Sequence, residues 1–262
     1  MRLKIIFRPE GVAIFGWNYT NYLRGVLYRA LERASPPVAT ALHDLGLEAD
    51  GKVYKLLTFS PLFPKEKRVL PTGIQVKGDV VWLASSPLGT LMEALAQGLL
   101  ELGRVQIGEV ECSVRGVEVM PERNFGREAR FVTLPPIVAS TGIREGGKLV
   151  KKFLSPDHPD FHRVLAQNLA RKYRALHGKE PEGSIRFEFH PPFKSKLVEI
   201  NGTKVRGYKM RLTLRGEPGL IKLAYEAGLG ERTAQGFGML ELLDFVLRKA
   251  DIRGDGEARG EK

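Results

Sequence analysis

The chain has 262 residues, of which 43% are hydrophobic and 27% charged, a balance typical of soluble globular proteins. This composition excludes a disordered chain, and the sequence has no run of about 18 apolar residues that could form a membrane helix. The single cysteine, Cys112, excludes an internal disulfide and a cysteine-based zinc cluster. Because residues 1–11 lack a signal-peptide pattern, we expect a cytoplasmic protein with no membrane partner.

The net charge of +11 is concentrated in the second half of the chain. Residues 1–122 hold 14 basic and 13 acidic side chains, whereas residues 123–262 hold 27 basic and 17 acidic ones. A one-sided positive field indicates a polyanionic partner, most often nucleic acid. A basic surface without a partner is the alternative, and charge alone does not separate RNA from DNA or from anionic lipid.

The first half alternates strand and helix patterns. Residues 2–9 alternate as a strand does, and residues 19–34 carry apolar side chains at the three- and four-residue spacing of a helix. They are followed by a short helix at 35–46, strands at 53–60 and 80–84, a helix at 87–102 and an alternating segment at 105–120. The resulting order, β-α-β-β-α-β, is that of a ferredoxin-like domain.

The second half repeats this order of elements, although not the sequence itself. Its predicted elements are strands at 130–134 and 149–153, a helix at 159–176, strands at 184–190, 194–200 and 204–214, a helix at 219–227 and a strand at 237–245. We therefore predict an α+β protein with two ferredoxin-like domains in tandem. The domains span residues 1–122 and 123–246, and the polar, Gly-rich residues 247–262 form a disordered tail.

The strongest local motif is a glycine-rich loop between a helix and a strand. Two Gly-x-Gly units, Gly228/Gly230 and Gly236/Gly238, are separated by five residues. Glycines allow positive φ and close approach of another backbone, as a phosphate-binding loop requires, and Arg232 adds a positive charge at the tip. The alternative is a glycine-capped helix end followed by a tight turn that binds nothing.

This loop resembles the C-terminal glycine-rich motif of the RAMP superfamily of CRISPR-associated proteins. Within that superfamily the chain resembles the Cas6 family, the endoribonucleases that cut CRISPR repeat transcripts into guide RNAs. The resemblance covers most of residues 1–245 and includes, in the family's order, the segments YLRGVLY (22–28), ATALH (39–43), KLLTFS (55–60), FVTLPPI (131–137) and YEAGLGE (225–231). It implies two ferredoxin-like domains, CRISPR repeat RNA as substrate, and cleavage without a metal or other cofactor.

Three side chains in these segments can carry the chemistry. His43 lies in the last turn of the predicted helix 35–46, where the helix dipole favours a protonated imidazole. Taken alone, His43 fits a surface position, Tyr28 a packing position and Lys55 an ordinary exposed position. The resemblance indicates instead that all three belong to an active site.

RNA self-cleavage explains why these residue types belong together. The 2′-hydroxyl attacks the adjacent phosphate and the 5′-oxygen leaves, which requires a base, an acid and a cation. We expect His43 to transfer a proton with Tyr28 as its partner, and Lys55 to stabilise the charge on phosphorus. The resemblance implies 2′,3′-cyclic phosphate and 5′-hydroxyl products. The sequence leaves open which of His43 and Tyr28 is the base.

A basic hairpin in the second half offers a grip on RNA. The dipeptide Asn201-Gly202 favours a tight hairpin turn between two predicted strands. Both faces of the second strand are basic, which is unusual for a half-buried strand. A solvated hairpin tip is the alternative. We predict that RNA is bound by Lys194, Lys196, Lys204, Arg206, Lys209 and Arg211, together with the glycine-rich loop.

Two further motifs fail on inspection. Residues 142–149 nearly match a P-loop, but Leu149 stands where a Mg²⁺-binding hydroxyl is required. His158 and His162 have a spacing that could suit a metal, but their segment is typical of a helix start. We therefore predict no metal site.

The leading hypothesis is a metal-independent endoribonuclease that processes CRISPR repeat RNA. The alternative is a RAMP subunit that holds guide RNA in a CRISPR effector complex without cutting, and a general RNA chaperone is a third reading. The first two predict salt-sensitive binding to RNA, and only the first needs His43, whereas a chaperone would show no preference for a repeat stem-loop. The sequence does not decide between a monomer and a homodimer.

Overall fold

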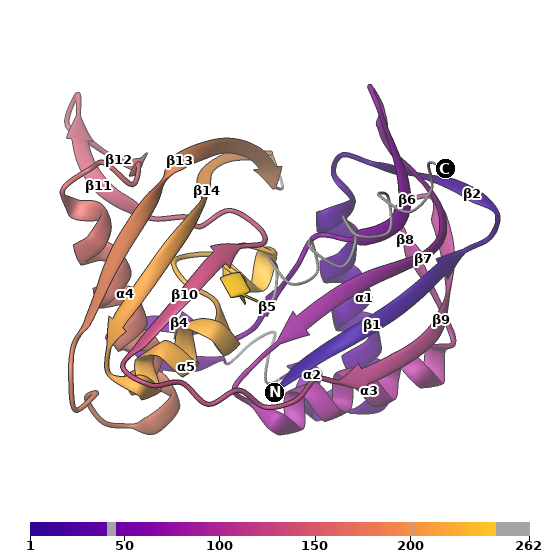
Figure 1. Ribbon diagram of the computed structural model, residues 1–262, viewed down its shortest axis with the longest axis horizontal. Helices are drawn as coiled ribbons and strands as arrows, with labels where there is room; N and C mark the ends of the chain where they lie inside the picture. Colours follow the sequence, from indigo (N-terminus) through magenta and orange to yellow (C-terminus); the bar gives the residue numbers. More distant parts are fainter. Residues whose placement is uncertain (41–45, 201, 245–262) are drawn as a thin grey trace, which may run out of the picture.

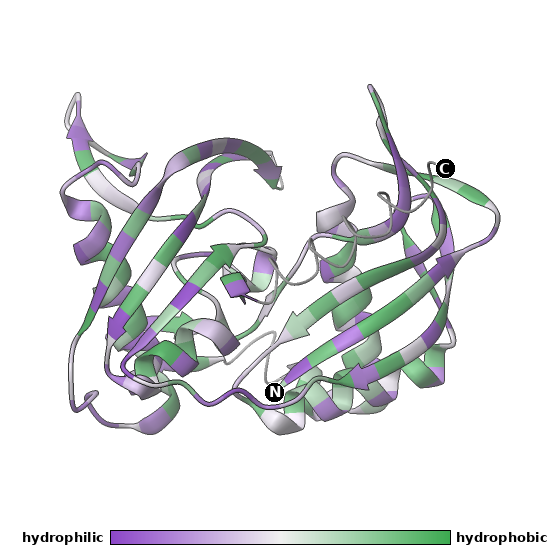
Figure 2. Ribbon diagram, in the orientation of Figure 1, coloured by the Kyte–Doolittle hydropathy of each residue, from purple (hydrophilic) through white to green (hydrophobic). Residues whose placement is uncertain are grey.

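The computed structural model describes residues 1–40, 46–200 and 202–244, so the tail predicted at 247–262 lies outside the described residues. The chain forms two lobes side by side, each with helices against a β-sheet (Figure 1). Strands β1 (Arg2–Pro9) and β7 (Gly73–Ser85) of the first lobe are mainly hydrophobic, whereas hydrophilic positions are frequent along β13 (Ile185–Ile200) and β14 (Thr203–Gly216) of the second (Figure 2). No described helix has the length and apolar character needed to cross a membrane.

The N-terminal lobe is built on a seven-stranded sheet in the order β2-β7-β1-β9-β8, with β5 and β6 also paired to β7. Strand β1 lies between β7 and β9, and helices α1 and α3 lie together on one side of this sheet (Figure 1). The elements are β1 (Arg2–Pro9), β2 (Val12–Gly16), α1 (Tyr19–Ala34), α2 (Pro36–Thr40), β3 (Leu47–Ala49), β4 (Lys52–Tyr54), β5 (Thr58–Phe59), β6 (Phe63–Leu70), β7 (Gly73–Ser85), α3 (Gly89–Leu102), β8 (Arg104–Ile107) and β9 (Val110–Val119).

The C-terminal lobe has a four-stranded sheet in the order β13-β14-β10-β15. Here β10 lies between β14 and β15, as β1 lies between β7 and β9, so both lobes have the ferredoxin-like connectivity and the predicted α+β class is confirmed. The elements are β10 (Glu128–Thr133), β11 (Ser140–Glu145), β12 (Lys148–Phe153), α4 (Asp160–His177), β13 (Ile185–Ile200), β14 (Thr203–Gly216), α5 (Pro218–Ala227), the 3₁₀ helix η2 (Thr233–Gln235) and β15 (Leu240–Leu242).

The apolar spacing of the helices sets how the first lobe packs. Leu23, Leu27 and Leu31 of α1 are fully buried, and α3 lies directly against this helix. At the contact, a Cβ on Gly98 would lie 1.8 Å from the carbonyl oxygen of Ala30, so the two backbones touch where α3 has no side chain. The two helices therefore form a tight layer against the sheet, and Trp82 of β7 is fully buried in the same core.

Several predicted strands differ from those observed. The strand predicted at 53–60 is broken into β4 and β5 at Leu56, which has a positive φ of 41°. The segment 105–120 is two strands joined at Gly108. Strands β2, β3, β6 and β11 were not predicted. Exposed polar positions hide the alternation in β6 and β11, whereas β2 consists only of apolar residues and glycine, with Val12 and Ile14 exposed, and β3 has only three residues.

The strand predicted at 149–153 is also placed differently. It is observed as β12, paired with β11 in a separate two-stranded hairpin outside the main sheet.

Polar contacts that are mostly buried join the two lobes. Arg2 on β1 bonds to Glu241 at 3.2 Å and to the carbonyl oxygens of Tyr225 and Leu240 at 2.8 and 3.0 Å. Its guanidinium also stacks 3.6 Å from the ring centre of Tyr225. The hydroxyl of Thr58 donates to the carbonyl of Phe237 at 2.9 Å. Since buried polar groups must find partners, these bonds hold the lobes in one relative position.

Candidate active site

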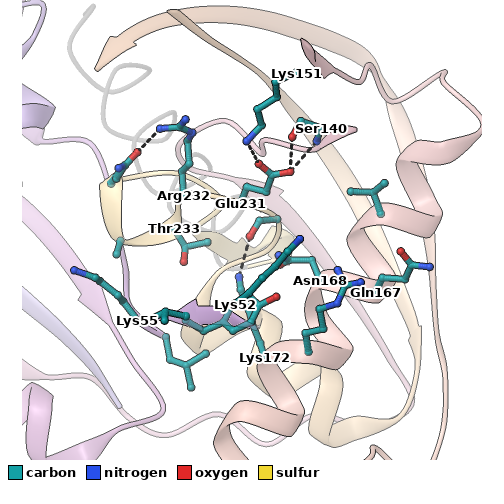
Figure 3. A pocket seen from close by; sticks show the side chains of 18 of the residues that line it. Lys52, Lys55, Ser140, Lys151, Gln167, Asn168, Lys172, Glu231, Arg232 and Thr233 are labelled. Atoms are coloured by element: carbon teal, nitrogen blue, oxygen red, sulfur yellow. Dashed lines mark hydrogen bonds and ion pairs between the residues drawn. The ribbon is translucent and has the colours of Figure 1, made fainter. Parts of the chain in front are cut away.

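A polar cleft of about 1340 Å³ lies where the two lobes meet. Its lining residues come from α1, β4, the β11–β12 hairpin, α4 and the glycine-rich loop. Figure 3 shows the side chains of α4, the loop and the hairpin around it. Its carboxylates, Glu32 and Glu231, are outnumbered by cations. The cations that line the cleft are Arg24, Lys52, Lys55, Lys151, Arg163, Arg171, Lys172 and Arg232. Such an excess of positive charge in a concave site favours a polyanion.

Tyr28 and Lys55 meet on one wall of this cleft. Helix α1 presents Tyr28 beside its buried stripe, and Lys55 follows β4. The Lys55 ammonium donates a hydrogen bond to the Tyr28 hydroxyl at 2.9 Å. Two of the three predicted catalytic residues are thus brought together, and the third, His43, lies outside the described residues.

The segment that carries Lys55 is anchored in the C-terminal lobe. Its neighbours Tyr54 and Leu56 are buried in the core formed by α4, α5 and the second sheet. The carboxylate of Asp50, in the β3–β4 turn, is bonded by Arg171 and Arg174 of α4. Tyr28 belongs to the first lobe and Lys55 is held by the second, so their contact depends on the docking of both.

The glycine-rich loop is closed on itself. All four glycines are buried with positive φ, and a Cβ on Gly230 would lie 2.4 Å from the carbonyl oxygen of Val138. The Leu229 and Gly238 amides donate to the carbonyls of Gly238 and Pro136, both at 2.9 Å. These glycines therefore permit close packing, and the cationic side chain that the loop carries into the cleft is Arg232.

Lys172 fastens this loop to α4. Lys172 is only 3% exposed. Its ammonium donates hydrogen bonds to the carbonyl oxygens of Gly228 and Gly230 at 2.8 and 2.9 Å (Figure 3). Burial lowers the pKa of Lys172 to about 7, and the negative charge of Glu231 acts in the opposite direction. A neutral amine retains two N–H groups, so both bonds can persist when the proton leaves.

Glu231 fastens the other side of the loop to the β11–β12 hairpin. Its carboxylate accepts from the amide and hydroxyl of Ser140 at 3.0 and 2.7 Å, and from Lys151 at 2.7 Å (Figure 3). The loop is therefore held from both sides of the cleft by charge-assisted bonds.

The basic hairpin lies away from this cleft. In β13–β14, Lys194 pairs directly with Lys209, and Arg206 donates to the hydroxyl of Ser195 at 3.0 Å. The six predicted hairpin residues all fall within the described residues, and none of them lines the cleft: Lys194, Lys196, Lys204, Arg206, Lys209 and Arg211.

Sequence reasoning predicted helix α4 but missed that one of its faces lines the cleft. Arg163, Gln167 and Arg171 recur every four residues on α4 and line the cleft, a stripe that could have been recognised beside the apolar one. Lys172 gave no such signal, because a lysine in a helix is expected to be exposed.

Comparisons with known proteins agree over nearly the whole chain. Residues 14–118 match the family described as CRISPR-associated protein Cas6, N-terminal, and residues 120–242 match CRISPR associated protein Cas6, C-terminal. The chain is 29% identical over 243 residues to CRISPR-associated endoribonuclease Cas6 1 of Methanocaldococcus jannaschii, covering 92% of each protein.

Two solved structures are similar along the full fold. One, described as CRISPR associated protein Cas6, has a TM-score of 0.81 and 29% identity and covers 93% of this chain and 99% of its own. The other, described as an RAMP protein binding different RNA substrates, has a TM-score of 0.82 and 26% identity with the same coverage. From the two family matches and these relatives, we conclude that the chain belongs to the CRISPR-associated Cas6 family.

Proposed function

We propose that this protein is an endoribonuclease that cleaves CRISPR repeat RNA in the cleft between its lobes, without a metal ion. The observation that carries the proposal is the Lys55–Tyr28 hydrogen bond of 2.9 Å inside a cleft with an excess of cations. The M. jannaschii relative is named an endoribonuclease, and the similar RAMP protein is described as binding different RNA substrates. Both descriptions support RNA as the substrate.

The reaction uses the RNA's own nucleophile. A base takes the proton of the 2′-hydroxyl, the 2′-oxygen bonds to phosphorus, and the bond from phosphorus to the 5′-oxygen breaks. An acid donates a proton to the departing oxygen, which leaves a 2′,3′-cyclic phosphate and a 5′-hydroxyl. His43 and Tyr28 divide the roles of base and acid.

Lys55 supplies the positive charge in this scheme. Its ammonium lies next to the Tyr28 hydroxyl, where it can stabilise negative charge on that oxygen or on the pentacoordinate phosphate. The neighbouring Arg232 can hold a flanking phosphate, while the glycines shape the loop that presents it.

Cleavage of labelled repeat RNA in excess EDTA tests the proposal. We expect a single cut that survives EDTA and is lost with a 2′-deoxy nucleotide at the cleaved position, and with His43→Ala. Tight binding without a cut by the unaltered protein would favour a guide-RNA-binding subunit instead. A metal requirement would contradict the chemistry even if RNA is cut.

A modified leaving group assigns the two proton-transfer roles. An RNA with a bridging 5′-sulfur at the cleaved position has a leaving group that needs no acid. This substrate should restore cutting to whichever of His43→Ala and Tyr28→Phe lacks the acid, and not to the other. Restoration of both variants or of neither would contradict the division of roles.

A further inference from the structure

The inner face of the β13–β14 hairpin carries three lysines. Lys194 lies opposite Lys209, and Lys196 is the next residue on the same face. That face continues into Val205 and Ile200, which are buried in a small core with Phe237. It is therefore the side of the hairpin that turns towards the protein.

This hairpin arches from the C-terminal lobe towards the N-terminal lobe (Figure 1). Near its end, the side-chain amide of Asn21, in the first turn of α1, contacts the carbonyl oxygen of Glu199 at 3.4 Å. The arch thus reaches the first lobe at the start of α1.

Strand β6 of the N-terminal lobe carries a fourth lysine on its inward face. Lys67 is paired with Val76, whose side chain is buried, so Lys67 lies on the inward face of its ribbon. The next residue, Arg68, is paired with Gln75 and lies on the outward face.

The charges of these lysines act on one another across the lobes. The pKa of Lys209 is lowered by burial and then by the charges of Lys196, Lys194 and Lys67. Within the described residues, no carboxylate forms an ion pair with any of the four. Like charges gathered without a counter-charge disfavour one another, and a bound anion removes that cost.

We infer that Lys67, Lys194, Lys196 and Lys209 form one surface, the four-lysine patch, that both lobes share and that binds the phosphate backbone of RNA beside the cleavage position. The inference rests on the proposed function and adds β6 of the N-terminal lobe as an RNA-binding element. It also gives the basic residues on the inner face of the hairpin a role, since the charges of Lys196, Lys194 and Lys67 all act on Lys209.

The patch is separate from the site of chemistry. None of its four residues, all of them described, lines the cleft. Asn21, which the hairpin touches, lies two turns before Tyr28 on α1, or about 10 Å along the helix. RNA held at Tyr28 therefore reaches the patch with nucleotides that flank the cleaved bond.

Salt dependence of RNA binding tests this surface. Binding of repeat RNA is measured from 50 to 500 mM salt for the unaltered protein, Lys67→Ala, Lys194→Ala and the double variant. Each lost contact to single-stranded RNA should reduce the slope of log K against log salt by about 0.7. The ratio of variant to unaltered Kd should then fall about fivefold for each tenfold rise in salt. Arg68→Ala is the matched control, since it removes an equal charge from the opposite face of the same strand.

RNA length provides a second arm. The loss caused by Lys67→Ala should disappear when the RNA is shortened on the flank that the patch binds. An unchanged slope in Lys67→Ala, or one changed equally by Arg68→Ala, would overturn the inference while RNA cleavage by the unaltered protein continues. Absence of cleavage by the unaltered protein would instead overturn the proposed function.

Discussion

Two regions of this molecule gather positive charge, and they do so in different ways. In the cleft, cations are tied to protein groups: Lys55 to Tyr28, Lys151 to Glu231, and Lys172 to two loop carbonyls. In the four-lysine patch, the described structure gives no lysine an ion-pair partner, and Lys209 is surrounded by like charge.

This difference suits the cleft cations to positioning the RNA for cleavage and the four-lysine patch to raising the affinity for RNA. A cation held by neighbouring groups keeps a fixed place, and where its partner is a carboxylate, as Glu231 is for Lys151, its charge is also partly compensated. A cation without a counter-charge has no fixed geometry but attracts phosphate strongly and in a salt-dependent manner. We therefore expect changes in the cleft to lower the cleavage rate, and changes in the patch to lower affinity.

The largest expected effect is on the rate. His43→Ala removes a proton-transfer group, so we expect the single-turnover rate at saturating RNA to fall about 10²–10⁴-fold. Binding, measured with a 2′-deoxy substrate that cannot be cut, should change little. A loss of binding as large as the loss of rate would mean that His43 acts through RNA affinity and not through proton transfer.

A change in the glycine-rich loop should act on stability and rate together. Gly230→Ala forces a side chain at φ +83° and 2.4 Å from the Val138 carbonyl, which we expect to cost about 1–3 kcal/mol in the free energy of unfolding. Urea denaturation and the cleavage rate measure both effects. The control is Gly146→Ala, which also has a positive φ but nothing within 4 Å. Equal losses in the two variants would mean that close packing of the loop is unimportant.

The next effect is a pH dependence of stability. Folding lowers the pKa of Lys172 from 10.5 to about 7, so between these values the unfolded chain binds more protons than the folded one. Its contribution to the free energy of unfolding should therefore rise with pH, by up to about 1.4 kcal/mol per pH unit. Urea denaturation between pH 7 and 10 measures this slope, which should be smaller in Lys172→Met. The same slope in both proteins would contradict a lowered pKa of Lys172 in the folded state.

The smallest effect compares two exposed lysines. Lys151 is already paired with Glu231, whereas Lys194 lies opposite Lys209 and has no ion-pair partner among the described residues. We expect Lys194→Ala to reduce the salt slope of RNA binding by about 0.7, and Lys151→Ala to change it by less than half as much. The reverse order would remove the distinction between held and uncompensated cations.

The sequence predicts best those parts of the fold where one face is buried. The apolar stripes of α1, α3 and α4 are clear, and these helices are found within two residues of their predicted bounds. Strand β6 was missed because nearly every position is exposed, which leaves no alternation to detect. Leu56 was missed as a strand break, since a positive φ at leucine is set by tertiary packing.

The candidate site also has parts that the sequence predicts and parts that it does not. Tyr28 and Lys55 were named from a resemblance, and the structure shows a hydrogen bond between them. The cleft itself could not be predicted, because α4, the β3–β4 hairpin and the glycine-rich loop are far apart in the chain. A role for Lys67 could not be predicted either, because it depends on the position of the β13–β14 hairpin of the other lobe.

One segment from the first half of the sequence packs in the second lobe, and this has a consequence for partial chains. Residues 47–56 come from the first half of the sequence, yet Tyr54 and Leu56 belong to the core of the second lobe. A fragment that ends near residue 122 would leave these side chains without their packing partners and Lys55 without its anchor. The nuclease chemistry that we propose would therefore appear only when synthesis of the second lobe is complete. A chain truncated before the second lobe would be unable to hold Lys55 against Tyr28.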